Sequence, residues 1–552
     1  MFKENKDHEQ GHMFTEEEMM SPRLKKKLEK HWSGIFYEQI FCDIDEKVFK
    51  PLYCEHFGRG NFPVNILVGI EILKELFSLT DEQLFDRYHF DFSFRRALGL
   101  KDINEHILAE RTLYYFRSSI AEHEFIHGEN LMMPVFVDGR DKIIEELGLK
   151  TGLQRTDSTL IGANIKRMSR LMLFHKVLSN LVRDLLVLEI FVSSEIQEMV
   201  RDDEDGFTYR LKKEEVLSKT KEIGEYIYRL VTRDGLEAYT NELKSFKDAE
   251  RLLREQCNIV KGKITIRESK DIDSSSMQNP SDTDATYRKK RNKKYRGYAA
   301  HATETCDIEN EIQVITDVDV VKNNVDDSDV LEGNIKKLKE ETDLDTIITD
   351  GTFASDGVRD ECKENDVQLV TSAIRGRLPN KESEERLTSR DFDIESKTGR
   401  MKCCPNGIYP RSQKLQEGVL TANFDPKICT QCAKNNICPA FSSSKLSRIV
   451  IDDRRKWLDE RHELMKTEEY RALCNLRPPV EGLMEKLKPK YLSGRTLFRG
   501  LSKVKNRMIL RAIGLNFRRY TAYKLELLAC SMRNVYIFLE NHFFWKNRVT
   551  CS

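Results

Sequence analysis

Midway along the chain, strand-like and helix-like segments alternate, and this alternation restricts the fold more than any other feature of the sequence. Strands are predicted at 311–318, 345–351 and 367–372, and helices between them at 329–341 and 355–365. Consecutive strands joined through helices form right-handed crossovers, which place the strands in a parallel sheet. The sequence therefore predicts an α/β core.

Asp350 stands at the carboxyl end of the second of these strands, in the sequence Thr349-Asp350-Gly351. Open α/β sheets bind ligands at this end of their strands. Gly351 allows the chain to turn away sharply and to leave the carboxylate uncovered. Asp350 is therefore a candidate ligand-binding acid, and the structural alternative is that it caps the helix that follows.

Helical patterns dominate two other regions, residues 1–140 and residues 165–270. In the first, apolar residues recur at helical spacing over 65–77, and Thr80-Asp81-Glu82-Gln83 is typical of a capping box. Several short helices of this kind suit a DNA-binding bundle or a purely structural one. In the second, apolar residues at three- and four-residue spacing indicate a helical insertion.

The charge balance excludes a global attraction to DNA or to anionic lipid. Among the 552 residues, Lys and Arg total 91 and Asp and Glu also total 91, so DNA binding would have to come from local patches. The first residues lack the apolar core of a signal peptide, and charged residues interrupt the most apolar stretch, 171–192. We therefore expect a soluble, cytosolic protein with no membrane partner.

Positive charge is concentrated in two segments. Residues 288–296 hold seven cations in nine positions, beginning with Arg288, Lys289, Lys290 and Arg291. This run is predicted to contact phosphate, and a solvated loop or hairpin is the alternative. Further on, an apolar helical stripe over 497–515 is accompanied by cations that lie off it and that could also meet phosphate: Lys503, Arg507, Arg511, Arg518 and Arg519.

Thirteen cysteines in a chain without an export signal favour thiols or metal ligation over disulfides. The strongest local cluster consists of Cys404, Cys429, Cys432 and Cys438, in which Cys429-x2-Cys432 has the spacing of a zinc knuckle. Cys403 is adjacent and could replace Cys404. Four thiolates can close a tetrahedral structural Zn²⁺ site, and reduced, unliganded cysteines are the alternative.

Glu481 is predicted to lie in the first turn of a helix. Pro478 and Pro479 favour a helix start, which places Glu481 where the helix dipole favours its ionised form and leaves Arg477 just outside the helix. Lys488 follows Glu481 by seven residues, about two turns, so the two side chains are predicted to share one face. In isolation, Glu481 could simply complete a cap.

The order of these features resembles the DDE transposases of bacterial insertion sequences. The matching segments are Thr156-Asp157-Ser158-Thr159, Asp282-Thr283-Asp284-Ala285 leading to Gly297-Tyr298, Thr349-Asp350-Gly351, and Arg477 with Glu481 and Lys488. In that family the third acid lies in a Tyr-x2-Arg-x3-Glu-x6-Lys signature, and here Cys474 holds the tyrosine position. The helical N-terminal region is also similar to the N-terminal domain common in these transposases.

The resemblance implies a ribonuclease-H-like α/β core, in which a mixed sheet is flanked by helices, and a catalytic site formed by Asp157, Asp350 and Glu481. Three such carboxylates can hold two Mg²⁺ (or Mn²⁺) ions. The implied reactions are cleavage at the inverted repeats that end the element and joining of the freed 3′-hydroxyl groups to target DNA. The expected DNA contacts are Arg477, Lys488, Arg288, Lys289, Lys290, Arg291, Arg111 and Arg117.

The implied partners are the transposon ends and target DNA, with a homo-oligomer in the synaptic complex and association with the bacterial nucleoid when DNA is bound. The main alternative is a catalytically inactive or domesticated DNA-binding protein derived from a transposase. A zinc-stabilised structural or regulatory protein is a third possibility.

The expected domain order combines these regions. It comprises an all-α DNA-binding domain (1–140), a catalytic core (150–164 and 280–400) interrupted by the helical insertion (165–270), a small zinc-binding-like cysteine segment (401–445), the C-terminal helices of the core with the third acid (446–530), and a tail (531–552).

Overall fold

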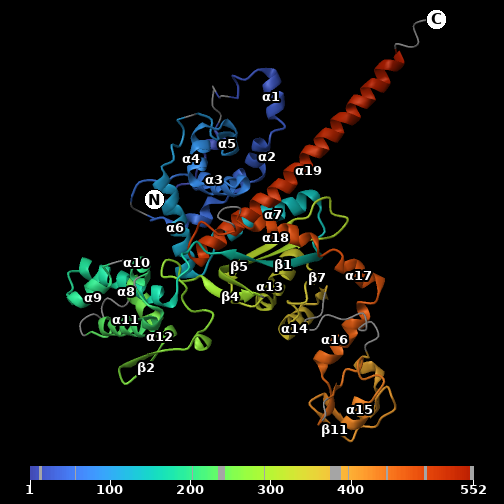
Figure 1. Ribbon diagram of the computed structural model, residues 1–552. Coiled ribbons are helices and arrows are strands. Elements are labelled where there is room, and N and C mark those ends of the chain that lie inside the picture. Colours follow the sequence, from blue (N-terminus) through green and yellow to red (C-terminus); the bar gives the residue numbers. More distant parts are fainter. Residues whose placement is uncertain are drawn as a thin grey trace. The chain divides into compact units, whose positions relative to one another are not determined.

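The computed structural model describes the chain in two compact units (Figure 1). The first unit contains residues 1–150, 157–326 and 481–552, and the second contains residues 151–156 and 327–480. The described residues are 1–10, 15, 17–55, 58–102, 104–201, 203–209, 211–233, 243–290, 292–372, 387–395, 397–442, 445–489 and 494–546.

The N-terminal part of the first unit is helical, as predicted. Its helices are α1 (Pro22–Leu28), α2 (Trp32–Gln39), α3 (Val64–Phe77), α4 (Asp81–Phe90), α5 (Phe92–Ala97), α6 (Glu110–His127) and α7 (Met133–Leu147), with 3-10 turns at Asp7–Glu9, Phe41–Asp43 and Glu46–Leu52. The predicted capping box is confirmed, because Thr80 and Gln83 bond each other's backbone N–H groups at the start of α4.

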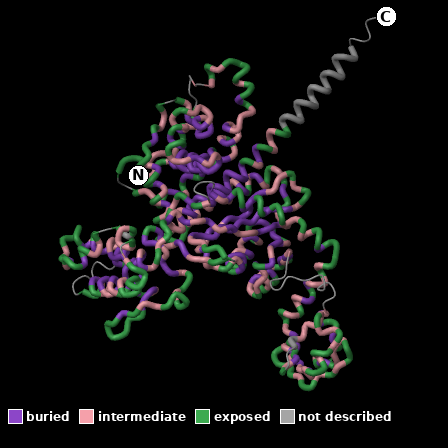
Figure 2. The backbone as a smooth tube through the Cα atoms, viewed as in Figure 1, coloured by how far each residue is buried: buried purple, intermediate pink, exposed green. Residues whose placement is uncertain are grey.

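A long C-terminal helix, α19 (Leu501–Lys546), packs against α3, α6 and α7 and against strand β6 (Ile315–Lys322). Buried residues run along α3 and along the first half of α19 (Figure 2). The N-terminal helices and the C-terminal helix therefore share one core, although hundreds of residues separate them in the sequence.

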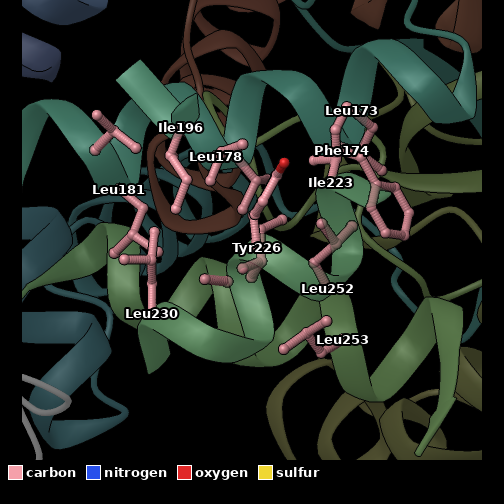
Figure 3. Packing of buried hydrophobic residues seen from close by; sticks show 14 of the residues in the cluster. Leu173, Phe174, Leu178, Leu181, Ile196, Ile223, Tyr226, Leu230, Leu252 and Leu253 are labelled. Carbon is pink, nitrogen blue, oxygen red and sulfur yellow. The ribbon is translucent and has the colours of Figure 1, made fainter. Parts of the chain in front are cut away.

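The predicted insertion forms a helical body with its own core. It contains α8 (Arg170–Val187), α9 (Ser194–Met199), α10 (Glu204–Tyr209), α11 (Val216–Val231), α12 (Lys244–Gln256) and the hairpin β2 (Cys257–Val260) to β3 (Lys263–Ile266), with 3-10 turns at Lys213–Glu215 and Ser269–Asp271. Phe174, Leu178, Ile223 and Leu252 point toward one another in its centre (Figure 3). Because α8, α11 and α12 bury their apolar faces against one another, this segment has a core of its own.

Three strands that follow the insertion in the first unit pair in the antiparallel direction. β4 (Thr286–Lys290) pairs with β5 (Lys293–Thr305), and β5 pairs with β6. Residues 311–318 were expected to contribute a parallel strand, and this expectation is wrong in both bounds and direction. β6 is antiparallel because it returns beside β5 through a short connection, with no helix between them.

The second unit holds the predicted parallel arrangement. The first residues of β1 (Leu153–Gly162) pair in parallel with β7 (Thr346–Thr349), and β7 pairs in parallel with β8 (Gln368–Thr371). Helices α13 (Asp327–Thr342) and α14 (Asp356–Glu364) supply the crossovers. Strand β1 has residues in both units, and the complete sheet has the mixed order β4-β5-β1-β7-β8 with β6 beside β5.

The remainder of the second unit contains the cysteine segment and the helices that follow it. A strand pair, β9 (Asp393–Ile394) and β10 (Met401–Cys403), precedes a four-stranded antiparallel sheet of β11 (Ser412–Gln416), β12 (Val419–Phe424), β14 (Ser447–Ile451) and β13 (Phe441–Ser442). This segment also contains α15 (Pro426–Thr430) and a 3-10 turn at Ser389–Asp391, and it is followed by α16 (Asp453–Leu464), α17 (Glu468–Cys474) and the start of α18 (Pro479–Leu487). Within the described ranges, no helix is both long enough and apolar enough to span a membrane.

Candidate functional site

Asp350 lies immediately after β7, as the sequence predicts, and its side chain is 32% exposed. One carboxylate oxygen accepts a hydrogen bond from the backbone N–H of Thr352 at 2.7 Å, which holds the turn. The alternative that Asp350 caps the next helix is wrong, because Ser355 accepts the N–H of Val358 and caps α14. Asp350 is therefore a half-buried acid at a strand end that has no capping role in α14.

Arg477 lies beside this acid. Its guanidinium Nη2 is 3.9 Å from Oδ2 of Asp350, and its side chain is 14% exposed. The adjacent loop is attached to the sheet by Arg155 of β1, whose Nη1 donates to the carbonyl of Leu476 at 2.5 Å. The fold thus brings together an acid and an arginine that are far apart in the sequence.

Asp157 lies on β1 and belongs to the first unit. Its side chain is half-buried, and its Oδ1 accepts the N–H of Ser158 at 2.8 Å. Arg155, two residues earlier on the same strand, belongs to the second unit, where it pairs with Ile348 of β7.

Glu481 is the third residue of α18 and is exposed, so the predicted first-turn position is confirmed. Arg477 lies just outside the helix, also as predicted. α18 ends at Leu487, but the N–H of Lys488 still donates to the Met484 carbonyl at 3.2 Å, as in a helix. The Lys488 ammonium bonds Glu485 at 2.8 Å, and the face that Lys488 shares with Glu481 stays a prediction.

In the family signature a tyrosine is expected at the position of Cys474. In this chain a tyrosine, Tyr470, lies one helical turn earlier. Both Tyr470 and Cys474 lie on α17, and both reach the end of β8 at Thr371. The Tyr470 hydroxyl accepts the Thr371 N–H at 3.0 Å, while the Cys474 thiol is 3.8 Å from the Thr371 carbonyl. Sequence reasoning missed Tyr470, although the four-residue spacing that puts it on the same helix face was visible.

The basic run forms the β4–β5 hairpin in the first unit. Lys289 and Lys290 are exposed, and Arg288 is half-buried and donates to the Asn323 carbonyl at 3.4 Å. Arg291, the fourth predicted contact in this run, lies outside the described residues. The hairpin alternative is confirmed as a structure, and the contact with phosphate stays a prediction.

The Asp282–Ala285 motif supports the start of α19. The Asp282 carboxylate accepts the N–H of Gly500 at 3.2 Å and the hydroxyl of Tyr298 at 2.6 Å, and Asp284 accepts the N–H of Leu501 at 3.0 Å. Burial raises the pKa of Asp282, and the hydrogen bonds oppose that shift. Carboxylates at a helix N-terminus are favourable, so these two acids stabilise α19 at its first residues.

The two arginines of α6 differ in their surroundings. Arg117 is engaged by acids: its guanidinium lies 2.6 Å from Glu71 and 2.7 Å from Asp81. Arg111 is exposed, donates to the Tyr115 hydroxyl at 2.7 Å and stacks over that ring. The structure therefore gives Arg117 a packing role within the helical bundle, and Arg111 stays available as a predicted DNA contact.

The expected phosphate-facing arginines of α19 are directed elsewhere. Arg507 and Arg511 are buried, and both bond Glu75, while Arg507 also bonds Glu71. Arg518 donates to the Leu76 carbonyl, and Arg519 donates to Glu304 at 2.7 Å. The expectation is wrong for Arg507 and Arg511, because α19 is covered on several sides and the sequence pattern shows only one apolar stripe. Arg518 is exposed and Arg519 is half-buried, and for these two a contact with phosphate stays a prediction.

The four cysteines lie around the small sheet of the second unit. Cys404, Cys429 and Cys438 pack partly buried against its apolar core, and Asn406 donates to the Cys432 sulfur at 3.5 Å. Burial raises the pKa values of Cys429 and Cys438, and the neighbouring thiols raise them further. Nevertheless, across the described ranges no three or more His, Cys, Asp or Glu side chains are arranged to hold a metal ion.

Two protein-family models match separate parts of the chain. Residues 267–517 match the transposase DDE domain, and residues 23–119 match a transposase domain (DUF772). The chain belongs to the insertion-sequence DDE transposases. The first match contains Asp350, Glu481 and the basic hairpin of the transposase, and the second contains Arg111 and Arg117.

The family match leaves the first predicted acid of this transposase untested, because Asp157 precedes residue 267. The helical insertion lies between Asp157 and the matched segment. No curated protein and no solved structure matches the chain significantly. The DDE domain implies a ribonuclease-H-like fold, with which the mixed sheet and flanking helices agree.

Proposed function

We propose that the transposase binds the terminal inverted repeats of an insertion sequence, cleaves the DNA at the element ends and joins the 3′-hydroxyl ends to target DNA. The observation that carries this proposal is Asp350: a half-exposed acid at the end of a central parallel strand, with Arg477 beside it, inside a matched DDE domain. The acid can ligate a cation, and the arginine can contact a phosphate.

Asp157, Asp350 and Glu481 are the proposed ligands of the Mg²⁺ or Mn²⁺ ions that DDE transposases generally use. Their carboxylate oxygens suit a hard cation, which, when bound, would activate the attacking oxygen and stabilise the leaving oxygen. Asp350 supports the assignment by its partly exposed position after β7, and Glu481 supports it by its exposed position in the first turn of α18. Arg477 and the hydrogen bond from Thr352 would hold the Asp350 carboxylate in one orientation.

The proposed DNA contacts follow exposure and charge. Lys289 and Lys290 of the hairpin are exposed, and Arg111 presents a guanidinium on the surface of α6. Lys488 is half-buried and bonds Glu485, so phosphate would have to compete with that acid. Contacts of this kind position a duplex without specifying sequence. Two ends must be held together, which a homo-oligomer would accomplish.

The test is Mg²⁺-dependent nicking of a duplex taken from the DNA that flanks the gene. Asp350→Asn and Glu481→Gln should abolish nicking while leaving DNA binding in place. Matched controls lie on the same elements: Asp345→Asn precedes β7 at its other end, and Glu485→Gln lies one turn further along α18. Full nicking by either active-site variant would refute the assignment. Binding without nicking by the unaltered protein would instead select the inactive, DNA-binding alternative.

A structural zinc ion held by Cys404, Cys429, Cys432 and Cys438 is a separate proposal. It rests on the zinc-knuckle spacing of Cys429 and Cys432 and on ligand chemistry, since thiolates are preferred zinc ligands. Protein purified without chelator should contain about one equivalent of zinc. A content below about half an equivalent would contradict the proposal and select reduced, unliganded thiols.

A further inference from the structure

The register of the β4–β5 hairpin places lysines directly opposite one another. Lys289 pairs with Lys294, and Lys290 pairs with Lys293. All four side chains are exposed. Like charges at directly opposed positions of an antiparallel pair destabilise it. The hairpin therefore carries a repulsion that a bound anion would relieve.

The charge is present on both faces of the hairpin. Side chains alternate between faces along a strand, so Lys290 and Lys293 lie on one face and Lys289 and Lys294 on the other. Among the described residues, none of these four ammonium groups has a carboxylate partner. If the hairpin contacted phosphate from one side only, lysines on a single face would be sufficient. The lysines on both faces therefore suggest contacts on both sides.

The base of the hairpin is held firmly. Gly297 has a φ of +146°, and a Cβ at this position would lie 2.2 Å from the carbonyl oxygen of Ile161 in β1. The backbone of β5 thus passes so close to β1 that only glycine fits. The Arg296 carbonyl accepts the N–H of Ala163 at 3.0 Å, and the Arg296 side chain bonds Gln278 at 3.1 Å. A fixed base presents the lysine pairs with little conformational freedom.

We propose that the β4–β5 hairpin enters the major groove of duplex DNA and contacts the phosphates of both strands, one strand from each face. A sheet with its side chains is about 10 Å thick from face to face, and the major groove of B-DNA is about 12 Å wide and admits a two-stranded ribbon. The proposal deepens the proposed function, on which it rests, by assigning one face of the hairpin to each DNA strand.

The test compares two variants, Lys289→Gln/Lys294→Gln for one face and Lys290→Gln/Lys293→Gln for the other. Each lysine that contacts a phosphate contributes about 0.9 to the slope of log affinity against log salt concentration. Each pair should therefore reduce the slope by about 1.8, and the loss of affinity between about 50 and 200 mM salt should become about 12-fold smaller. The probe is the duplex from the DNA flanking the gene.

A control pair lies on a comparable hairpin of the insertion, where Lys261 and Lys263 are exposed beside the β2–β3 turn. Lys261→Gln/Lys263→Gln should leave the slope unchanged. Hydroxyl-radical protection should weaken on one DNA strand with the first hairpin variant and on the opposite strand with the second. An RNA duplex of the same sequence should show no effect, because its major groove is too narrow and deep for side chains to read.

Several results would overturn the inference. They are a change of slope in only one of the two face variants, loss of protection on the same strand in both, an equal effect in the Lys261/Lys263 control, or an equal effect with RNA. Each of these can occur while the unaltered protein still nicks DNA, in which case the proposed function stands. Absence of nicking by the unaltered protein would reject the proposed catalytic function. The salt dependence of DNA binding by the hairpin variants would still test the proposal for the hairpin.

Discussion

Replacing Arg507 by leucine would remove a cation from the buried network that joins α19 to α3. The guanidinium bonds Glu71 and Glu75, whose side chains are 2% and 7% exposed. Glu71 would retain Arg117 at 2.6 Å, and Glu75 would retain Arg511 at 3.3 Å. Removing one partner of a buried ion pair costs about 3–5 kcal/mol. Because each acid keeps one arginine, we expect a loss of about 3 kcal/mol.

Hydrogen exchange of the α3 amides measures this loss where it occurs. Lowering the opening free energy by about 3 kcal/mol accelerates exchange by a factor of about 160, after correction for the intrinsic rate. Amides of α13, which belongs to the second unit, should exchange as before. Arg507→Lys keeps a charge but loses the two-pronged geometry, so its effect should be smaller.

The dependence on pH separates charge from packing. Burial alone would raise the pKa of Glu71, but the guanidinium groups of Arg117 and Arg507 outweigh it and hold the pKa below its ordinary value. Such an acid stabilises the fold above its unfolded pKa of about 4.3, and the stabilisation disappears as pH falls through the folded pKa. In Arg507→Leu the folded pKa of Glu71 rises. The deficit should therefore be largest near neutral pH and shrink as the pH falls below about 4, through the lowered folded pKa of Glu71.

An unchanged exchange rate in α3 would refute this reasoning. A deficit in opening free energy that is equal across the pH range would refute the electrostatic part. The loss would then come from packing of the Arg507 side chain, whose guanidinium lies 4.7 Å from the centre of the Phe498 ring. The contribution of Arg507 would then be nonpolar.

Three further outcomes are expected. Gly297→Ala should lower the free energy of unfolding by about 3 kcal/mol in urea titrations, because its Cβ would meet the Ile161 carbonyl oxygen, and an unchanged midpoint would contradict the close approach. Burial lowers the pKa of Lys74 to about 8, so the unfolded chain binds more protons and stability should rise between pH 8 and 10.5; Lys74→Met should remove that rise. Tyr470→Phe should accelerate hydrogen exchange of the Thr371 amide, because loss of the hydroxyl leaves a buried N–H unpaired at a cost of about 1–3 kcal/mol. An unaltered exchange rate would show that the hydrogen bond is dispensable.

Much of the candidate site follows from local sequence. The position of Asp350 after β7 follows from an apolar strand followed by a glycine, and the first-turn position of Glu481 follows from Pro479. Both depend on backbone preferences of a few adjacent residues, which the sequence displays directly. The choice of Asp157 does not: it is one acid among 91 Asp and Glu residues, and only the family resemblance selects it.

The incorrect predictions concern contacts between distant residues. The sequence marks Arg507 and Arg511 as cations, but it does not show that acids of α3 bond them in the core. Likewise, β6 is recognisable as strand-like, yet its antiparallel direction depends on β5 beside it. A residue's charge is a local property, whereas its partner is decided by packing.

The sequence by itself determined the helical N-terminal region, the parallel β7–β8 segment with Asp350 at a strand end, the start of α18 before Glu481, and the local concentration of charge in the hairpin. These features follow from backbone and periodicity preferences acting over one or two turns. Tertiary structure alone decided that Arg477 lies beside Asp350, that Arg507 and Arg511 of α19 are buried, and that the hairpin lysines oppose one another. Those properties depend on which segments meet, and that outcome is set by burial over the whole chain.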